Sequence, residues 1–268
     1  MSWATLFAPM KLLAVHSFAV HGTASLKAFI SILGTRVLPV PSLYLSGLTN
    51  LPGVVKVQVD LDDLLANTLE LAKLKGEKLV VYIGYLGHPR QVSLIQEILH
   101  KYRQQILTVI FDPVSGDHGR TYVPEEIVKA WPELLAMADW ALPNYTELQL
   151  YSGLSPDGEE PQAYLDAFKE RFPGVNFIAT SLPAKDGLEM FLWHEGQGIR
   201  YQHERVPRNY GGSGDVFAAY FFKAHFFEKR PVEEAMKLAA HKTRDILSYS
   251  LEQESPDLIL SPQPEWNP

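Results

Sequence analysis

The chain has 268 residues, of which 46% are hydrophobic and 21% are charged, a composition typical of a folded protein with a sizeable core. Its formal net charge of −7 argues against nucleic-acid binding, because that function needs a cationic surface. The absence of cysteine excludes disulfides, thiolate nucleophiles and cysteine-ligated metal sites.

No apolar run in the sequence is long enough to cross a membrane. Residues 1–10 lack the basic start and the long apolar core of a secretory signal, and we interpret them as a flexible leader. We therefore expect a cytoplasmic protein with neither a membrane nor a nucleic acid as partner.

The first half of the chain alternates short apolar runs with longer segments of helical periodicity. Strands are predicted at 11–15 and 36–41, on either side of a helix at 24–33. A helix at 61–74 precedes a strand at 78–83, and a helix at 89–104 precedes a strand at 107–111. A helix at 125–138, interrupted near Pro132, leads to a short strand at 140–142.

The second half continues the alternation and adds a hairpin. Helices at 146–151 and 163–172 precede a strand at 176–180, and strands at 188–193 and 198–203 form a hairpin across Gly196. Helices at 216–227 and 231–249 close the chain. We expect one domain over residues 11–260, followed by a frayed tail at 261–268.

Strands that alternate with helices of ten or more residues imply parallel pairing through right-handed crossovers. The fold class is therefore α/β, with a mostly parallel central sheet and helices on both faces. Ligands of such sheets bind at the carboxyl ends of the strands. Five polar or glycine-rich loops follow predicted strands or open predicted helices, so we expect them to converge on one edge: 84–87, 112–119, 144–147, 180–181 and 211–215.

The loop at 211–215 reads Gly-Gly-Ser-Gly-Asp and directly precedes an apolar helix. Glycines let backbone N–H groups approach an anion, and the start of a helix adds partial positive charge. Asp215 could then accept a proton from a bound hydroxyl. Taken alone, so short a motif more often means a turn in which Asp215 caps the helix. No Gly-x4-Gly-Lys-Ser/Thr segment is present, which excludes a P-loop enzyme.

The other loops each have two interpretations. Asp112 and Asp117 suit a magnesium ion or its water shell, but Asp, Gly and Pro also form ordinary turns. Asn144 and Glu147 either cap a helix or face a nucleotide. Tyr85 either stacks on a planar ring or packs in the core. The loop histidines lack metal-ligand spacing, so we interpret them as polar lining and not as a zinc site: His16, His21, His88 and His118.

Taken in order, four segments resemble the ribokinase superfamily and, within it, the pyridoxal (vitamin B6) kinases. They are Y-I-G-Y-L-G at 82–87, F-D-P-V-S-G-D-H-G-R-T-Y-V at 111–123, the segment 138–153 with A-D, L-P-N-Y-T-E and S-G, and G-S-G-D-V-F-A-A at 212–219. The resemblance extends over roughly residues 11–250. It implies a ribokinase-like three-layer sandwich and ATP-dependent phosphorylation of the 5′-hydroxymethyl group of pyridoxal, pyridoxine or pyridoxamine.

The resemblance also implies roles for individual residues. Asp215 is similar to the family's catalytic base, and the N–H groups of Gly212, Ser213 and Gly214 resemble its anion hole. The positions similar to the family's ATP-binding residues are Asp112, Asp117, Asn144, Glu147, Thr180 and Ser181, with Asp112 and Glu147 also beside the metal. The positions around the pyridoxal ring are Ser17, Thr49 and Tyr85. ATP and Mg²⁺ are the implied cofactors and a homodimer the implied assembly, while a monovalent-cation requirement stays open.

The departures from the family pattern fall on the substrate side. A polar ring contact of the family is replaced by Phe18, and two polar groups are replaced by Gly47 and Leu48. This leaves a second interpretation, a kinase of hydroxymethylpyrimidine or another heteroaromatic alcohol. A third is a non-catalytic protein that binds a B6 vitamer, although a pure binder has no need of Asp215. A dinucleotide-binding oxidoreductase is disfavoured, because no Gly-x-Gly-x-x-Gly follows the first strand.

Overall fold

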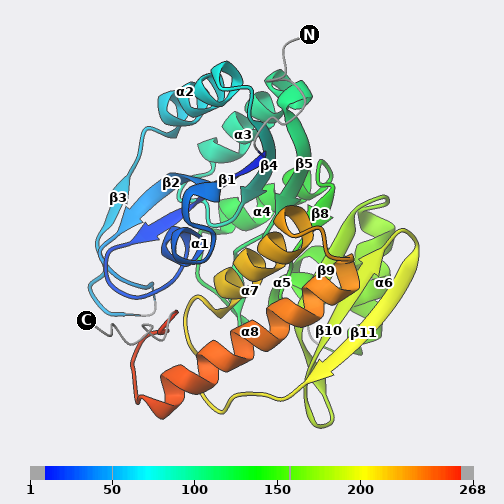
Figure 1. Ribbon diagram of the computed structural model, residues 1–268. Coiled ribbons are helices and arrows are strands. Elements are labelled where there is room, and N and C mark those ends of the chain that lie inside the picture. The colour runs from blue at the N-terminus through cyan, green and yellow to red at the C-terminus, as the bar shows by residue number, and fades with distance from the viewer. Residues whose placement is uncertain (1–9, 50, 157, 261–268) are drawn as a thin grey trace.

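The computed structural model describes residues 10–49, 51–156 and 158–260, so the predicted tail and all but the last residue of the predicted leader lie outside the described residues. Within them, nine strands form one sheet in the order β11-β10-β9-β8-β5-β4-β1-β2-β3 (Figure 1). The six strands from β9 to β2 are parallel to their neighbours, and β3, β10 and β11 are antiparallel additions. The strand bounds are β1 Met10–Ala19, β2 Val37–Leu45, β3 Lys56–Gln58, β4 Lys78–Ile83, β5 Ile106–Phe111, β8 Trp140–Ala141, β9 Asn176–Ala184, β10 Gly187–His194 and β11 Gln197–His203.

Helices cover both faces of this sheet (Figure 1). One face carries α1 Leu26–Leu33, α7 Ser213–Phe222 and α8 Val232–Glu252, which lie in front of the sheet in this view. The other face carries α2 Leu61–Leu74, α3 Arg90–Lys101, α4 Glu125–Leu135, α5 Tyr145–Ser152 and α6 Pro161–Arg171. The predicted three-layer α/β fold with helices on both faces is confirmed.

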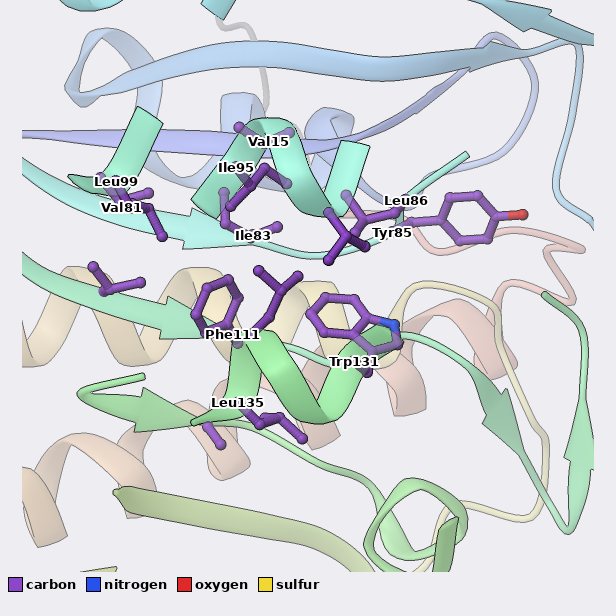
Figure 2. Close-up of a cluster of buried hydrophobic side chains, with 14 of the residues drawn as sticks. Val15, Val81, Ile83, Tyr85, Leu86, Ile95, Leu99, Phe111, Trp131 and Leu135 are labelled. Carbon is purple, nitrogen blue, oxygen red and sulfur yellow. The ribbon is translucent and has the colours of Figure 1, made fainter. Parts of the chain in front are cut away.

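The central strands read as continuous apolar runs because both of their faces are buried. Successive side chains point to opposite faces of a strand. Accordingly, Val81 and Ile83 of β4 join the core under α2–α6, whereas Tyr82 between them joins the core under α1, α7 and α8. Figure 2 shows the first of these cores, in which the buried indole of Trp131 meets the ring of Phe111 edge to face, 6.1 Å between centroids.

Three local features differ from the sequence-based expectations. The predicted interruption near Pro132 is wrong, since α4 runs through this proline. Proline removes one helical hydrogen bond, but the buried side chains of Trp131, Leu134 and Leu135 anchor both sides of it. The short strand β3 and the ribbon of β6 (Gly116–Asp117) with β7 (Arg120–Thr121) were not predicted. The helix predicted at 216–227 starts earlier, at Ser213, and ends in a π-helical turn at Lys223–Phe227.

Across the described ranges, no helix is both long enough and apolar enough to span a lipid bilayer.

Candidate active site

The predicted loops meet at one edge of the sheet, where the parallel strands end and α7 begins. Backbone hydrogen bonds join the strand ends: Gly84 N–H donates to Val15 O, and Asp112 N–H donates to Ile83 O, both at 2.9 Å. An isolated parallel bridge also pairs Asn144 with Thr180. The predicted convergence on one edge therefore follows from the parallel topology itself.

Asp215 is the third residue of α7, and its carboxylate contacts the N-terminal part of the chain. Ser25 N–H donates to Oδ2 at 2.6 Å, and His16 Nε2 lies 3.1 Å from Oδ1. The N-cap position belongs to Gly212, and no side chain caps the helix. The interpretation of Asp215 as a helix cap is therefore wrong. Its side chain is instead fixed between α7 and the β1–α1 connection.

Gly212 is required by the close approach of two segments. Its φ is +91°, a conformation that other residues adopt at a cost. A Cβ atom here would lie 2.5 Å from Thr23 O and 2.8 Å from Ala24 Cα. This approach brings the start of α7 against residues 23–25, and so brings Asp215 to Ser25. The first N–H groups of a helix have no intrahelical acceptor, so the turn with Ser213 and Gly214 is suited to an anion.

Asp112 follows β5 and is held by Tyr82 of β4, whose hydroxyl donates to Asp112 Oδ2 at 2.8 Å. Burial, and after it the charge of Asp215, raises the pKa of Asp112 to about 7. Burial and the charge of Asp112 also raise the pKa of Tyr82 well above its usual value, so Tyr82 keeps its proton and remains the donor. The Asp112 side chain is therefore poised to gain or lose a proton near neutral pH.

Asn144 and Glu147 form a reciprocal capping box at the start of α5. Glu147 N–H donates to the Asn144 side chain, and Asn144 N–H donates back to Glu147 Oε2, both at 3.0 Å. Glu147 Oε1 accepts a further hydrogen bond from Ser115 N–H at 2.9 Å. The capping interpretation is thus correct, and Glu147 also ties α5 to the loop after Asp112. Burial, and then the charge of Asp112, raises the pKa of Glu147 well above its ordinary value.

Repulsion between neighbouring carboxylates is the main argument that the site suits a cation. Within residues 10–49, 51–156 and 158–260, no three His, Asp or Glu side chains form a ready-made metal site. The repulsion between Asp112 and Asp215 would nevertheless be relieved by Mg²⁺. Asp112 fits such an ion better than Glu147, which is 2% exposed and whose oxygens both accept backbone hydrogen bonds.

A cavity of about 670 Å³ lies beside the start of α7, within the size range of small-molecule sites. Ser213 and Gly214 line it, as do the predicted nucleotide residues Asp117, Thr180 and Ser181. Ser181 has a φ of +59°, an unusual conformation for a non-glycine residue that is enriched at functional sites. The wall also includes three arginines that the sequence analysis missed: Arg205, Arg208 and Arg244. They come from the β11–α7 connection and from α8, and no short motif marks them.

The predicted substrate residues are not equally placed. Ser17 is buried, and its hydroxyl lies 2.7 Å from that of Ser25, next to Asp215. Thr49 is exposed in the turn after β2. Tyr85 is 4% exposed and belongs to the core, as its alternative interpretation held. Figure 2 shows its ring at the margin of that core, with the hydroxyl pointing away from the other labelled side chains. That hydroxyl lies 3.5 Å from Lys56 Nζ.

The three departures also have definite places. Leu48 lies against two glycines of the site: a Cβ atom would be 2.6 Å from Leu48 Cγ at Gly22, and 3.0 Å from Leu48 Cδ1 at Gly211. Gly47 is buried nearby, and the ring of Phe18 packs edge to face on Tyr44 at 5.9 Å. An apolar side chain thus stands beside the loop that carries Asp215.

The sequence did not predict the groups that hold the carboxylates of Asp112 and Asp215. His16 was interpreted as polar lining, and neither Ser25 nor Tyr82 was given a role. Tyr82 could have been found from strand alternation, since it points to the opposite face from Val81 and Ile83 and sits one strand from Asp112. Ser25 acts through its backbone N–H, which leaves no mark on the sequence.

Comparison with known proteins places this geometry in a family. Residues 49–257, most of the chain, match the family described as phosphomethylpyrimidine kinase. Pyridoxal kinase from Arabidopsis thaliana is 26% identical over 260 residues, with 90% of this chain and 82% of that protein covered. Pyridoxal kinase PdxY from Leifsonia xyli is 26% identical over 274 residues, covering 96% and 95%.

Solved structures agree. Pyridoxal kinase from Leishmania donovani in complex with ADP and pyridoxamine superposes with a TM-score of 0.75 at 25% identity, covering 94% of this chain and 90% of that one. The resemblance to the ribokinase superfamily and its pyridoxal kinases is thereby confirmed. The chain belongs to the phosphomethylpyrimidine kinase family.

Proposed function

We propose that this protein transfers the γ-phosphoryl group of ATP to the 5′-hydroxymethyl group of a vitamin B6 vitamer. The observation that carries the proposal is the position of Asp215. It directly follows Ser213 and Gly214, which line the large cavity, while its carboxylate contacts the buried imidazole of His16 and the backbone N–H of Ser25, neither of which lines that cavity. A base in this position separates a nucleotide site from an alcohol site.

The cavity is the proposed nucleotide site. The relative from Leishmania donovani binds ADP and pyridoxamine, and the cavity volume suits a nucleotide. Its arginines supply positive charge in a chain of net charge −7. The N–H groups at the start of α7 would face the transferring phosphoryl group, where fixed donors stabilise negative charge as it develops. Gly212, Ser213 and Gly214 form the proposed anion hole.

The proposed step is an in-line displacement. The alcohol oxygen bonds to the γ-phosphorus, its proton passes to Asp215, and the bond from the γ-phosphorus to the bridging oxygen breaks, which releases ADP. Ser25 N–H holds one carboxylate oxygen at 2.6 Å, so Asp215 reaches the alcohol in a fixed orientation. Because phosphoryl transfer depends mainly on positioning and charge stabilisation, this orientation is the principal contribution of the side chain.

We assign Asp112 to the magnesium site, and we assign Asn144 and Glu147 supporting roles next to it. Bound magnesium would offset the negative charge of the phosphates during transfer. Glu147 acts indirectly in this proposal, because it holds Asn144 and the Ser115 backbone in place. Asp117, Thr180 and Ser181 border the nucleotide.

A substrate panel tests the proposal. The purified protein is incubated with ATP and Mg²⁺ and with pyridoxal, pyridoxine, pyridoxamine or hydroxymethylpyrimidine in turn, and the phosphorylated product and ADP are quantified. We expect stoichiometric ADP and phosphate ester with at least one B6 vitamer. Turnover with hydroxymethylpyrimidine alone would replace the proposal with its closest alternative, and tight vitamer binding without any transfer would favour a non-catalytic binding protein.

The hydroxymethylpyrimidine alternative rests on two observations. The matching family is described as phosphomethylpyrimidine kinase, a name that shares the pyrimidine ring of this alternative substrate. In addition, Leu48 places an apolar contact where the family resemblance leads us to expect a polar one. We rank it second, because the two relatives named above are pyridoxal kinases that match over 82% and 95% of their length.

Further elements of the proposal concern the whole protein. We propose one kinase domain over residues 11–260, a homodimer and a cytoplasmic location, each carried over from the sequence analysis. Sedimentation velocity tests the dimer. Titration of K⁺ and Na⁺ into the assay tests the monovalent-cation requirement that the sequence leaves open.

A further inference from the structure

His16 is a buried titratable side chain for which the proposed mechanism has no use. It lies toward the carboxyl end of β1 and is 3% exposed. Its imidazole stacks on Tyr82, with 6.0 Å between ring centroids and 16° between planes, and it packs against Phe29 at 6.5 Å. On another side it touches Gly84, where a Cβ atom would lie 2.1 Å from His16 Cδ2. The ring is therefore held in one orientation.

The hydrogen bonds of the ring define which nitrogen carries the proton. Ser17 N–H donates to His16 Nδ1 at 2.8 Å, so Nδ1 must present a lone pair. A ring with an unprotonated Nδ1 is neutral and has its hydrogen on Nε2. His16 is thus a fixed donor through Nε2–H, with a tautomer that its neighbour's backbone determines.

Nε2 lies beside the candidate base but forms no hydrogen bond with it. It lies 3.1 Å from Asp215 Oδ1. Within the described part of the chain, however, this buried nitrogen has no acceptor in hydrogen-bonding alignment. Buried polar groups are nearly always paired, so an unpaired donor next to the candidate base calls for a functional explanation. Meanwhile Asp215 Oδ2 is already occupied by Ser25 N–H. The unpaired donor and the less occupied carboxylate oxygen therefore lie 3.1 Å apart, close enough for one hydroxyl oxygen to reach both.

We infer that His16 Nε2–H donates a hydrogen bond to the oxygen of the acceptor alcohol, while Asp215 takes that alcohol's proton. This inference rests on the proposed function and adds a residue to it. The hydroxyl oxygen accepts from His16 and donates to Asp215, which fixes its remaining lone pair toward the γ-phosphorus. As the O–H bond breaks and the O–P bond forms, the proton goes to Asp215, ADP leaves and His16 keeps its own proton. His16 is then a catalytic residue that touches the substrate.

Gly84 has a place in this arrangement. Its lack of a side chain gives the imidazole the room to lie beside the carboxylate, since any Cβ atom would overlap Cδ2 and Nε2 of His16. Gly84, which follows β4, thus leaves room for His16 on the adjacent strand β1, with which β4 pairs in parallel.

Two substitutions separate donation from packing. His16→Gln keeps an N–H donor of similar reach, whereas His16→Phe keeps a flat ring against Tyr82 and removes the donor. His100→Gln, on the exposed side of α3, is the matched control. Values of kcat and KM for the alcohol and for ATP are measured with the best substrate of the panel, together with the melting temperature.

We expect His16→Phe to lower kcat/KM for the alcohol by about 10- to 100-fold, the effect of one hydrogen bond to a group that becomes charged. KM for ATP should stay within about twofold. His16→Gln should retain activity within about fivefold of the wild type, and His100→Gln should match the wild type. Equal losses in the Gln and Phe variants, or full activity of His16→Phe, would overturn the inference. Absence of turnover in the wild type would instead overturn the proposed function.

A measurement on the unmodified protein keeps the inference testable where His16→Phe does not fold. Long-range ¹H–¹⁵N correlation spectra of histidine-labelled protein report the tautomer and the Nε2 shift. We expect the Nε2–H tautomer for His16, and a change of its Nε2 shift when the alcohol is added with a non-hydrolysable ATP analogue. A proton on Nδ1, or an Nε2 chemical shift that does not change when the alcohol binds, would overturn the inference.

Discussion

The two sides of Asp215 are built differently. On the proposed nucleotide side lies a cavity of about 670 Å³, bordered by the loops that most resemble the kinase motifs. On the proposed alcohol side the groups are close-packed: His16 and Ser17 are buried, and Leu48 rests against Gly22 and Gly211. The departures from the family pattern, at positions 18, 47 and 48, also fall on this second side.

This difference separates the features that phosphoryl transfer requires from those that select the alcohol. Phosphoryl transfer requires an anion-binding turn, a base and a site for the metal, and these depend on backbone geometry such as the left-handed Gly212. Choice of alcohol depends on a few side chains around one hydroxyl. Substitutions on the two sides should therefore change different kinetic constants.

The largest effect, on kcat, is expected at Asp215, which lies between the two sides. Asp215→Asn keeps the shape of the side chain but removes the proton acceptor, so kcat should fall by about 10²- to 10⁴-fold. ATP binding, measured by calorimetry, should persist, because Ser213 and Gly214 are unchanged. Asp62→Asn, on the exposed side of α2, is the control and should behave as the wild type. Turnover of Asp215→Asn near the wild-type value would remove Asp215 from the catalytic role.

A pair of glycine substitutions tests the backbone of the anion-binding turn. Gly212→Ala would place its Cβ 2.5 Å from Thr23 O at a φ of +91°, so we expect the free energy of unfolding to fall by about 1–3 kcal/mol. Gly214→Ala is the matched control for stability, because its Cβ meets no atom within 4 Å. It should leave the free energy of unfolding unchanged or raise it by less than about 1 kcal/mol. Denaturant titration of both variants makes the comparison, and equal stabilities would contradict it.

The alcohol side is tested by Leu48→Ala. The substitution removes the side chain that packs on Gly22 and Gly211, and so loosens the wall next to Asp215. We expect KM for the alcohol to rise by about 3- to 10-fold, as for the loss of a few apolar contacts. KM for ATP should change by less than about twofold. Leu74→Ala, at a leucine that is 82% exposed, is the control. An equal change in both KM values would show that the two sides are not independent.

The fold could be predicted from sequence wherever one periodicity dominated. The bounds predicted for α2 and β4 match the structure, because Leu65, Leu69 and Ala72 mark one helical face and β4 is a continuous apolar run. Pro132 was misread, because the burial of Trp131 and Leu135 outweighs the cost of a proline, and burial is not visible in a local pattern. The strands β3, β6 and β7 have two or three residues each, too few to show a period.

The candidate site could be predicted only in part, and for a related reason. Asp215 and Asp112 stood out as acids in glycine-containing loops. Their partners did not: Ser25 contributes a backbone N–H from 190 residues away, and His16 is set by the parallel pairing of β1 with β4. Arg205, Arg208 and Arg244 enter the cavity wall from segments with no motif. Groups that act through tertiary contact leave no local signal.

The smallest effect that we predict concerns pH and the nucleotide side. The pKa of Asp112 is raised to about 7, whereas aspartate in an unfolded chain titrates near pH ~4. Between these values the folded protein binds a proton that the unfolded chain does not bind. The free energy of unfolding should therefore fall as the pH rises through this range, because the ionised carboxylate is less stable in its buried site.

Melting curves of the ligand-free protein between pH 5 and 8 measure this effect. Other groups contribute to both profiles, so the informative quantity is the difference between the wild type and Asp112→Asn. We expect the melting temperature of the wild type to fall by roughly 2–4 °C more than that of the variant over this range. Tyr82→Phe sharpens the test: the Tyr82 hydroxyl stabilises the ionised carboxylate, so without it the fall should extend to higher pH. Identical wild-type and Asp112→Asn profiles would mean that folding does not raise the pKa of Asp112, and the argument for a cation beside Asp112 would lose its basis.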